Sequence, residues 1–199
     1  MNQKIPESYE QKCQVLSEQA KVILSTHPQS VGLDKKTSNL FRQQNRRQSK
    51  LDVSNLNSII DINTEHQFLD VEGMTTYEDI VNATLPHGLI PTVIPELKTI
   101  TIGGALAGIG IESSSFRYGL VHETVLEFDM LMPDGNIITC TPHNEHANLF
   151  FAFPNLYATL GYATRVRVML QKIKPYIHLQ HLRYHTIEEA INAIQYHCT

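Results

Sequence analysis

Residues 95–119 read PELKTITIGGALAGIGIESSSFRYG and decide how this chain is interpreted. The stretch holds five of the ten glycines and a run of three serines; its closely spaced small residues are Gly103, Gly104, Gly108, Gly110, Ser113, Ser114 and Ser115. Glycine lets a backbone pass very close to a ligand, and successive free N–H groups can form an anion-binding concavity. With the serine hydroxyls as further donors, the stretch suits a pyrophosphate and so a dinucleotide, although a plain cluster of turns is the alternative.

Two common nucleotide-binding motifs do not fit this stretch. Gly108 and Gly110 supply G-x-G, but position 113 is serine, and SSSFRYG predicts a loop instead of the helix that a Rossmann fingerprint requires. The chain contains no Gly-Lys-Ser/Thr, so a P-loop is excluded.

The composition narrows the class of protein. The chain has 199 residues, 42% of them hydrophobic, and a formal net charge of −4. That charge argues against a nucleic-acid binder, which should carry a basic face. No apolar run approaches the roughly 18 residues of a membrane span, and the N-terminus is not typical of a secretory signal.

The cysteines and histidines of the chain do not indicate disulfide bonds or a metal site. The three cysteines, Cys13, Cys140 and Cys198, lie far apart and form no C-x-x-C pair, which favours a reducing, cytoplasmic setting without disulfides. The ten histidines are scattered, and the pair His143 and His146 has no further ligands nearby in sequence. We expect no metal site.

Periodicity predicts the elements of the N-terminal half. A helix is expected over about 8–26, because apolar residues recur on one face, and a loop is expected over 31–48. Residues 57–62 and 67–72 predict a hairpin. Thr75 or Thr76 can cap a following helix, which Pro86-His87-Gly88 ends before an apolar stretch at 89–94.

The C-terminal half predicts further strands. Residues 125–131 and 136–141 flank Pro133-Asp134-Gly135, which is typical of a hairpin. A short helix within 142–154 and a strand over 162–170 follow. Beyond Lys174 we expect a strand over 176–184 and a helix from Thr186, with acidic residues in its first turn.

The glycine–serine stretch resembles the flavoprotein family of vanillyl-alcohol oxidase and para-cresol methylhydroxylase, in the branch that contains the Δ24-sterol reductases. The run GIGIESSS at 108–115 is its most specific part. Further points of resemblance are Pro95-Glu96-Leu97, Thr101–Gly104, Tyr118-Gly119, Asp134-Gly135, Cys140-Thr141-Pro142, Asn148-Leu149-Phe150 and Thr159-Leu160-Gly161.

The resemblance implies an α+β fold of the PCMH type, in which two α/β subdomains hold FAD and a cap domain covers the flavin. We therefore expect an N-terminal helix in 1–28, an FAD-binding domain in 29–173, and the beginning of a truncated substrate or cap domain in 174–199.

The resemblance also implies the residues that contact FAD. The family's first phosphate loop corresponds to Lys36–Leu40, which lacks the usual glycines. The expected contacts are Ser38, Asn39, Thr101, Ile102, Gly103, Gly104, Gly108, Gly110, Ser113, Ser114, Ser115 and Gly161. Residues 37–39 contain no histidine and residues 103–119 contain no cysteine, so neither segment offers a side chain of these types for covalent attachment of FAD. We therefore expect FAD to be bound non-covalently.

By resemblance, the chain is part of an oxidoreductase that transfers hydride between FAD and an alkene-type, sterol or lipid-like substrate, with NADPH as a possible electron donor. No catalytic acid or base is identified; Glu112 near the flavin loop could equally form a surface salt bridge. Peripheral contact with a membrane is compatible with such a substrate. The alternatives are a non-catalytic flavin-binding module, a split subunit that needs a partner chain for its cap, and a degenerate scaffold that binds no flavin.

Overall fold

The structure is a computed structural model, and it describes residues 8–26, 31–35 and 49–198. The α-helices are α1 (Tyr9–Thr26), α2 (Tyr77–Thr84), α3 (Ile102–Gly108), α4 (Ser115–Tyr118), α5 (Ala147–Ala152) and α6 (Ile187–Cys198). The strands are β1 (Val31–Asp34), β2 (Ser49–Asp52), β3 (Ile59–Asn63), β4 (Phe68–Glu72), β5 (Leu89–Pro91), β6 (Val125–Leu131), β7 (Ile137–Cys140) and β8 (Tyr162–Lys172). Short 3-10 helices cover Leu85–His87 and Val121–Thr124.

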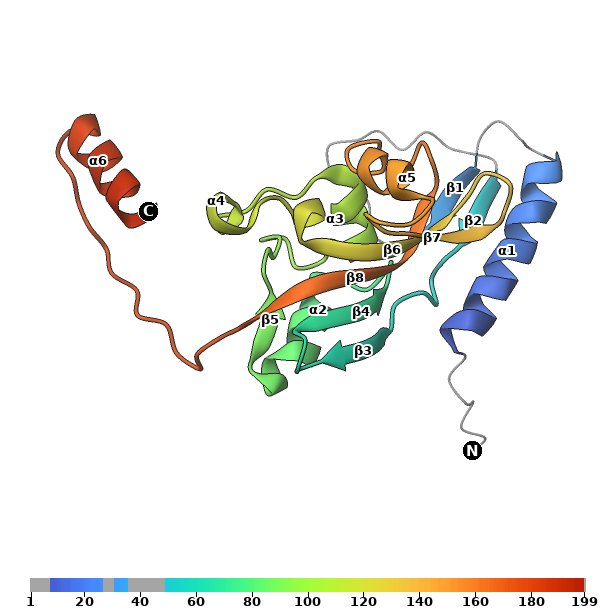
Figure 1. The fold of residues 1–199 in the computed structure, drawn as a ribbon, viewed down its shortest axis with the longest axis horizontal. Coiled ribbons are helices and arrows are strands. Elements are labelled where there is room, and N and C mark those ends of the chain that lie inside the picture. The colour runs from blue at the N-terminus through green and yellow to red at the C-terminus, as the bar shows by residue number, and fades with distance from the viewer. Residues whose placement is uncertain (1–7, 27–30, 36–48, 199) are drawn as a thin grey trace.

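An antiparallel sheet forms the centre of the molecule. Its strands lie in the order β3-β4-β8-β6-β7, and β5 pairs with the far end of β8. Strand β8 is the longest and pairs with β4, β5 and β6, so the other strands are arranged around it. Figure 1 shows β8 crossing the middle of the fold.

Helices α2, α3 and α5 cover one face of this sheet and bury the main core with it. Alternate residues of a strand point to opposite faces, and the inward set here is apolar. The core joins side chains of the sheet (Leu69, Val71, Phe128, Met130, Val166 and Val168) to side chains of the helices (Tyr77, Ile80, Ile102, Leu106 and Phe150).

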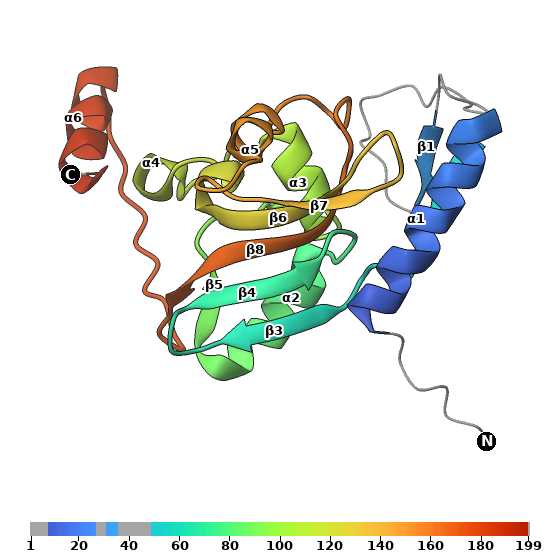
Figure 2. The same ribbon diagram turned by 45° about the vertical axis from the view of Figure 1, so that its right-hand side comes forward.

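A second, smaller unit lies at one end of the sheet. Strands β1 and β2 are parallel, and α1 packs against them through a separate apolar cluster that includes Leu16, Ala20, Leu51 and Leu131. Helix α1 also reaches the sheet, because Lys12 forms a buried ion pair with Glu72 at 2.8 Å and Tyr9 donates a hydrogen bond to Asp129 at 2.9 Å. Figures 1 and 2 show α1 beside β1 and β2 at this end.

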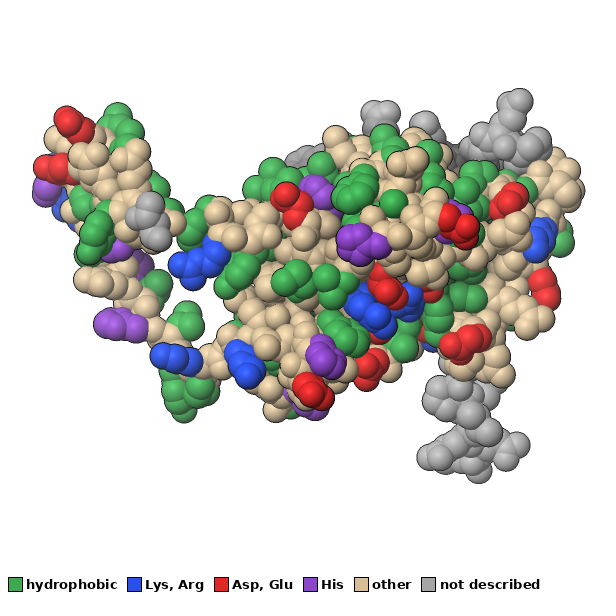
Figure 3. Space-filling model, in the orientation of Figure 1, with side chains coloured by type: hydrophobic (Ala, Val, Ile, Leu, Met, Phe, Trp, Pro, Cys, Tyr) green, Lys and Arg blue, Asp and Glu red, His purple; other side chains and the backbone are tan. Residues whose placement is uncertain are grey.

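The face of the sheet opposite the helices carries a network of charges. Arg165 on β8 binds Asp70 on β4 at 2.6 Å, and it binds Asp129 on β6 at 2.8 Å. Arg167 extends the network to Asp70 and to Glu127. Figure 3 shows basic and acidic side chains gathered over the central strands. Because each arginine binds carboxylates of both neighbouring strands, the network holds β4, β8 and β6 together from the side opposite the core.

The C-terminal segment leaves this body. Residues 174–186 have no regular structure, and α6 stands apart from the sheet (Figures 1 and 2). Its apolar side chains are exposed, with Tyr176 87%, Ile177 89% and Ile187 80% accessible. Of the helices among the described residues, none is both long and apolar enough to cross a membrane.

The mixed α+β class and most of the predicted elements are confirmed, including α1, both hairpins, and α2 with its Thr76 cap. Three predictions are wrong. Val31–Asp34, expected within a loop, is a strand because it pairs in parallel with Ser49–Asp52 across an intervening segment. Residues 176–184 form no strand, because no strand in the described part of the chain pairs with them. The serine loop contains one helical turn, α4.

The Lys12–Glu72 pair yields a prediction on stability. Replacing Lys12 with Met leaves the Glu72 carboxylate buried without its cation, so we expect the free energy of unfolding to fall by about 3 kcal/mol in urea titrations. The double variant Lys12→Met/Glu72→Met should recover most of this loss, since neither charge remains buried. Lys21→Met on the exposed side of α1 is the control, and an equal loss there would contradict the role of the pair.

A second prediction concerns the loss of stability at low pH, which depends on Asp129. Burial alone would raise the pKa of Asp129, but the hydrogen bonds and charge of Arg165, together with Thr139 and Tyr9, outweigh burial and lower it. A carboxyl with a lowered pKa stabilises the fold above its unfolded pKa, about 3.9, and loses that contribution as the pH falls through the folded pKa. Stability should therefore be flat above about pH 5 and fall below about pH 4.

The acid prediction is checked with a matched pair of variants. Asp129→Asn should be less stable at neutral pH, and its free energy of unfolding should fall less steeply in acid. Urea unfolding at each pH measures both effects. Asp61→Asn, at an exposed carboxyl on β3, should keep the slope of the parent. Identical acid slopes for the Asp129 variant and the parent would refute the assignment.

Candidate functional site

The first half of the glycine–serine stretch forms the start of α3, and its backbone N–H groups are already bonded within the protein. Ile102 donates to the carbonyl of Thr75 at 3.0 Å, and Gly103 donates to the carbonyl of Gly73 at 2.9 Å. The N–H of Gly104 reaches the capping hydroxyl of Thr101 at 3.3 Å. These contacts anchor the helix start to the end of β4, so they leave few donors there for an anion.

Gly103 is glycine because two backbones meet at it. A Cβ at this position would lie 2.8 Å from the carbonyl oxygen of Gly73 and 3.2 Å from that of Ala163. Neither atom belongs to a side chain that could turn away. Gly103 therefore lets α3 approach β8 and the end of β4, which is a packing role.

Gly104 and Gly108 lie in a different environment on the same helix. Gly104 is exposed, and a Cβ there would meet only the hydroxyl of Thr101, at 2.9 Å. At Gly108 the nearest atom would be on the ring of Tyr157, at 3.7 Å. No strand backbone demands a glycine at either position, so the exposed backbone at Gly104 is open to a ligand.

The chain leaves α3 at Ile109 and then presents free donors. Ile109 has a positive φ of 55°, which ends the helix and redirects the backbone. Among the described residues, the N–H groups of Gly110, Ile111 and Ser113 have no hydrogen-bond partner. Gly110 also packs closely, since a Cβ would lie 2.5 Å from Cγ2 of Val121. The donors expected from the sequence thus lie just after the helix.

Two of the three serines have structural partners. The hydroxyl of Ser114 donates to the carbonyl of Thr92 at 3.1 Å. The hydroxyl of Ser115 accepts a hydrogen bond from the N–H of Glu112 at 3.0 Å and so closes the turn into α4. Ser113 is exposed. Ser113 is therefore the serine whose hydroxyl is most accessible to a ligand.

Gly161 and the segment before it complete this side of the fold. A Cβ at Gly161 would lie 2.3 Å from the carbonyl oxygen of Leu131, so the position serves the close pairing of β8 with β6. Before it, Asn155, Tyr157 and Ala158 all have positive φ, and the N–H of Tyr157 donates to the carbonyl of Ala107 at 3.2 Å. No sequence signal marks this strained segment, which packs against the end of α3.

The remaining candidates have simple surroundings. Ser38 and Asn39 lie outside the described residues. Glu112 accepts a hydrogen bond from the N–H of Glu96 at 3.2 Å, and the Tyr118 hydroxyl donates to Gln171 at 2.7 Å. In the part of the chain that the structure describes, no three His, Cys, Asp or Glu side chains are grouped to hold a metal ion.

A comparison with known families decides the identity of the domain. The FAD binding domain family matches residues 30–141, which include β1 to β7 and the whole glycine–serine stretch. This chain belongs to that family. The site built around α3 and residues 110–113 lies within the matched part.

Curated proteins that are similar to this chain include Δ24-sterol reductases and a cytokinin dehydrogenase. The chain is 37% identical to the Δ24-sterol reductase of Pisum sativum over 133 residues, and 33% identical to that of Homo sapiens over 126 residues. These alignments cover 67% and 63% of this chain but 24% of each reductase, so the chain spans about a quarter of the relatives it matches. Cytokinin dehydrogenase 10 of Oryza sativa is 35% identical over 112 residues, which cover 56% of this chain and 20% of that protein.

The fold also matches a solved flavoprotein structure. The 6-hydroxy-D-nicotine oxidase of Arthrobacter nicotinovorans superposes with a TM-score of 0.71 over 80% of this chain and 35% of that protein, at 19% sequence identity. At this identity the match shows the fold alone, and it confirms the expected PCMH-type architecture.

The packing role of Gly103 yields a prediction. Gly103→Ala should lower the free energy of unfolding by about 2–3 kcal/mol, because its Cβ overlaps the carbonyl oxygen of Gly73. Gly108→Ala, in the same helix but without a close neighbour, should leave stability unchanged or raise it by up to about 1 kcal/mol. Urea unfolding of both variants checks this, and equal stabilities would show that the close approach does not matter.

Proposed function

We propose that this chain binds FAD non-covalently, with the flavin held along Gly104 and residues 110–113. The observation that carries the proposal is that the N–H groups of Gly110, Ile111 and Ser113 have no partner among the described residues and lie inside the part that matches the FAD binding domain family. A flavin presents carbonyl oxygens and ring nitrogens that accept such hydrogen bonds. The exposed glycine backbone at Gly104 permits close approach of a bulky cofactor.

The full set of residues that we propose for the FAD site includes hydrogen-bond donors, glycines with exposed backbone, and residues that pack behind the site. It comprises Ser38, Asn39, Thr101, Ile102, Gly103, Gly104, Gly108, Gly110, Ser113, Ser114, Ser115 and Gly161. Within it, Ile102, Gly103 and Gly161 support the site by fixing α3 and β8, because their close neighbours are other backbones. Gly104, Gly110 and Ser113 would face the cofactor.

The wider activity that we propose is that of an oxidoreductase of the Δ24-sterol reductase type. Bound FAD supplies hydride transfer, and the protein binds and orients it. Similarity to the sterol reductases supports an alkene-type, sterol or lipid-like substrate, with NADPH as electron donor. The unpaired Cys13, Cys140 and Cys198 support a reducing, cytoplasmic setting.

The exposed C-terminal segment supports a proposed division of the chain into three parts. Residues 174–199 would begin a substrate or cap domain, residues 29–173 would form the FAD-binding domain, and residues 1–28 would form the N-terminal helix unit. The bare apolar side chains of Tyr176, Ile177 and Ile187 fit a segment that packs against further protein. A non-catalytic flavin module, or a subunit that takes its cap from a partner chain, would share this surface.

The proposal is tested by flavin retention. Purified protein mixed with FAD and passed through a desalting column should absorb between about 350 and 500 nm, and acid should release all of the colour into the supernatant. Colour left in the pellet would refute non-covalent binding, and protein that never retains FAD would refute the function. Bleaching by NADPH would support catalysis over passive binding.

A variant pair tests the position of the cofactor. Gly104→Asp should keep the fold, since an acid in the first turn of a helix is favourable, and should lose FAD because a charged side chain would cover the bare backbone along which the cofactor is proposed to lie. Asn192→Asp on the exposed α6 adds the same charge elsewhere and should retain FAD. Equal retention by both variants would show that the cofactor lies away from α3.

A further inference from the structure

The segment that joins α5 to β8 holds its backbone in an unfavourable conformation. Asn155, Tyr157 and Ala158 have positive φ angles of 64°, 49° and 66°, and none of them is glycine. A side chain in this left-handed region crowds the backbone, so such residues persist only where their surroundings fix them, and they cluster at ligand sites. The strain indicates that the position of residues 155–158 matters for more than the connection of two elements.

Contacts with the end of α3 fix this strained segment. The N–H of Tyr157 donates to the carbonyl of Ala107 at 3.2 Å. Ala107 lies in the last turn of α3, where carbonyl groups lack intrahelical donors. The N–H of Thr159 donates to the carbonyl of Leu156 at 3.1 Å and closes a turn around Tyr157. The backbone of Tyr157 is therefore held against the C-terminal end of α3.

The ring of Tyr157 lies beside the glycine face of α3. Its Cε1 atom would be 3.7 Å from a Cβ built on Gly108, which is an ordinary van der Waals contact. Gly104 comes four residues before Gly108 and so lies on the same side of the helix. Gly104 is exposed, and Tyr157 is 46% exposed. The tyrosine ring and the bare glycine backbone thus border one accessible surface.

The two segments that build this surface carry no charge. Residues 101–111 (TIGGALAGIGI) and 153–164 (FPNLYATLGYAT) contain no acidic or basic side chain. The phosphates of a dinucleotide are bound by cations and by groups of N–H donors, whereas its two ring systems are planar and aromatic. An aromatic side chain beside bare backbone offers a flat surface on which such a ring can stack. The surface therefore suits a ring system better than a phosphate.

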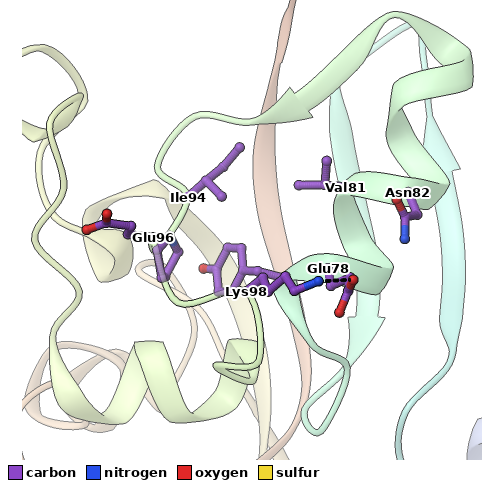
Figure 4. Close-up of a pocket in the computed structure, with 8 residues that line it drawn as sticks. Glu78, Val81, Asn82, Ile94, Glu96 and Lys98 are labelled. Carbon is purple, nitrogen blue, oxygen red and sulfur yellow. Dashed lines mark hydrogen bonds and ion pairs between the residues drawn. The ribbon is translucent and has the colours of Figure 1, made fainter.

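This surface is distinct from the cavity beside α2. That cavity has a volume of about 400 Å³, and its lining lies within residues 77–82 and 94–98. Figure 4 shows the Lys98–Glu78 ion pair at its edge, and neither α3 nor Tyr157 lines it. A small molecule held only by that cavity would leave Tyr157 untouched, so binding at the two places can be told apart.

We propose that the Tyr157 ring stacks on a planar ring of the bound cofactor, and that the strained segment holds the tyrosine in place for this contact. The inference rests on the proposed binding of FAD, and it names the side chain that receives an aromatic ring of the cofactor. Both the isoalloxazine and the adenine of FAD have the required chemistry, and flavin emission distinguishes them.

Four variants of the 199-residue chain test the contact, with FAD affinity measured by titration and the melting temperature as the check on folding. Tyr157→Ala should weaken FAD binding about tenfold, because it removes the stacking surface. Tyr157→Phe keeps the ring and should bind within about twofold of the parent, whereas Tyr157→Leu keeps apolar bulk without the ring and should bind like Tyr157→Ala. Tyr176→Ala, at a tyrosine that is 87% exposed, is the control and should bind normally.

Flavin emission identifies the ring that stacks on Tyr157. A tyrosine in contact with the isoalloxazine quenches its emission by donating an electron to the excited flavin, and phenylalanine does not. Brighter bound flavin in Tyr157→Phe would assign the contact to the isoalloxazine. Unchanged emission, with weakened binding in Tyr157→Ala, would assign it to the adenine.

The outcomes separate this contact from the binding of FAD itself. A parent chain that retains no FAD refutes the proposed function, and the stacking contact with it. If the parent binds FAD and Tyr157→Ala binds it equally well, the stacking contact alone is overturned. The same conclusion follows if Tyr157→Leu binds as tightly as Tyr157→Phe, because bulk and not aromatic stacking would then hold the cofactor.

Discussion

The fold depends on a place where three backbones meet without side chains between them. The N–H of Gly73 donates to the carbonyl of Thr164 at 2.8 Å, and the N–H of Gly103 donates to the carbonyl of Gly73 at 2.9 Å. A Cβ at Gly73 would lie 2.1 Å from the carbonyl oxygen of Ala163, so both glycines are required. This contact fixes the start of α3 against the ends of β4 and β8.

The same constraint divides the glycine–serine stretch into two parts with different tasks. At the helix start the N–H groups of Ile102 and Gly103 are hydrogen-bonded within the protein. Gly103 is needed there because two backbones pack closely against it. After Ile109 the chain leaves the helix, and the N–H groups of Gly110, Ile111 and Ser113 are free among the described residues. Among the described residues, the free backbone donors of the stretch therefore lie in the segment that follows the helix and not at the helix start. Rigid packing of the first part positions the donors of the second.

Local patterns in the sequence predicted the turns and helix caps that are built from adjacent residues. The turn at Pro133-Asp134-Gly135 and the Thr76 cap could be predicted because they are built from adjacent residues. Strand β1 could not, since it exists only by pairing with a segment about 18 residues away in sequence. The bond from the Ser114 hydroxyl to the carbonyl of Thr92 depends on a tertiary contact that no local pattern encodes.

Amide hydrogen exchange, measured residue by residue with and without FAD, tests the division of the stretch most directly. If free donors after α3 hold the flavin, FAD should slow exchange at Gly110, Ile111 and Ser113. Exchange at Ile102 and Gly103 should change little, because their N–H groups are already bonded. New protection confined to Ile102 and Gly103, with none at residues 110–113, would contradict the account.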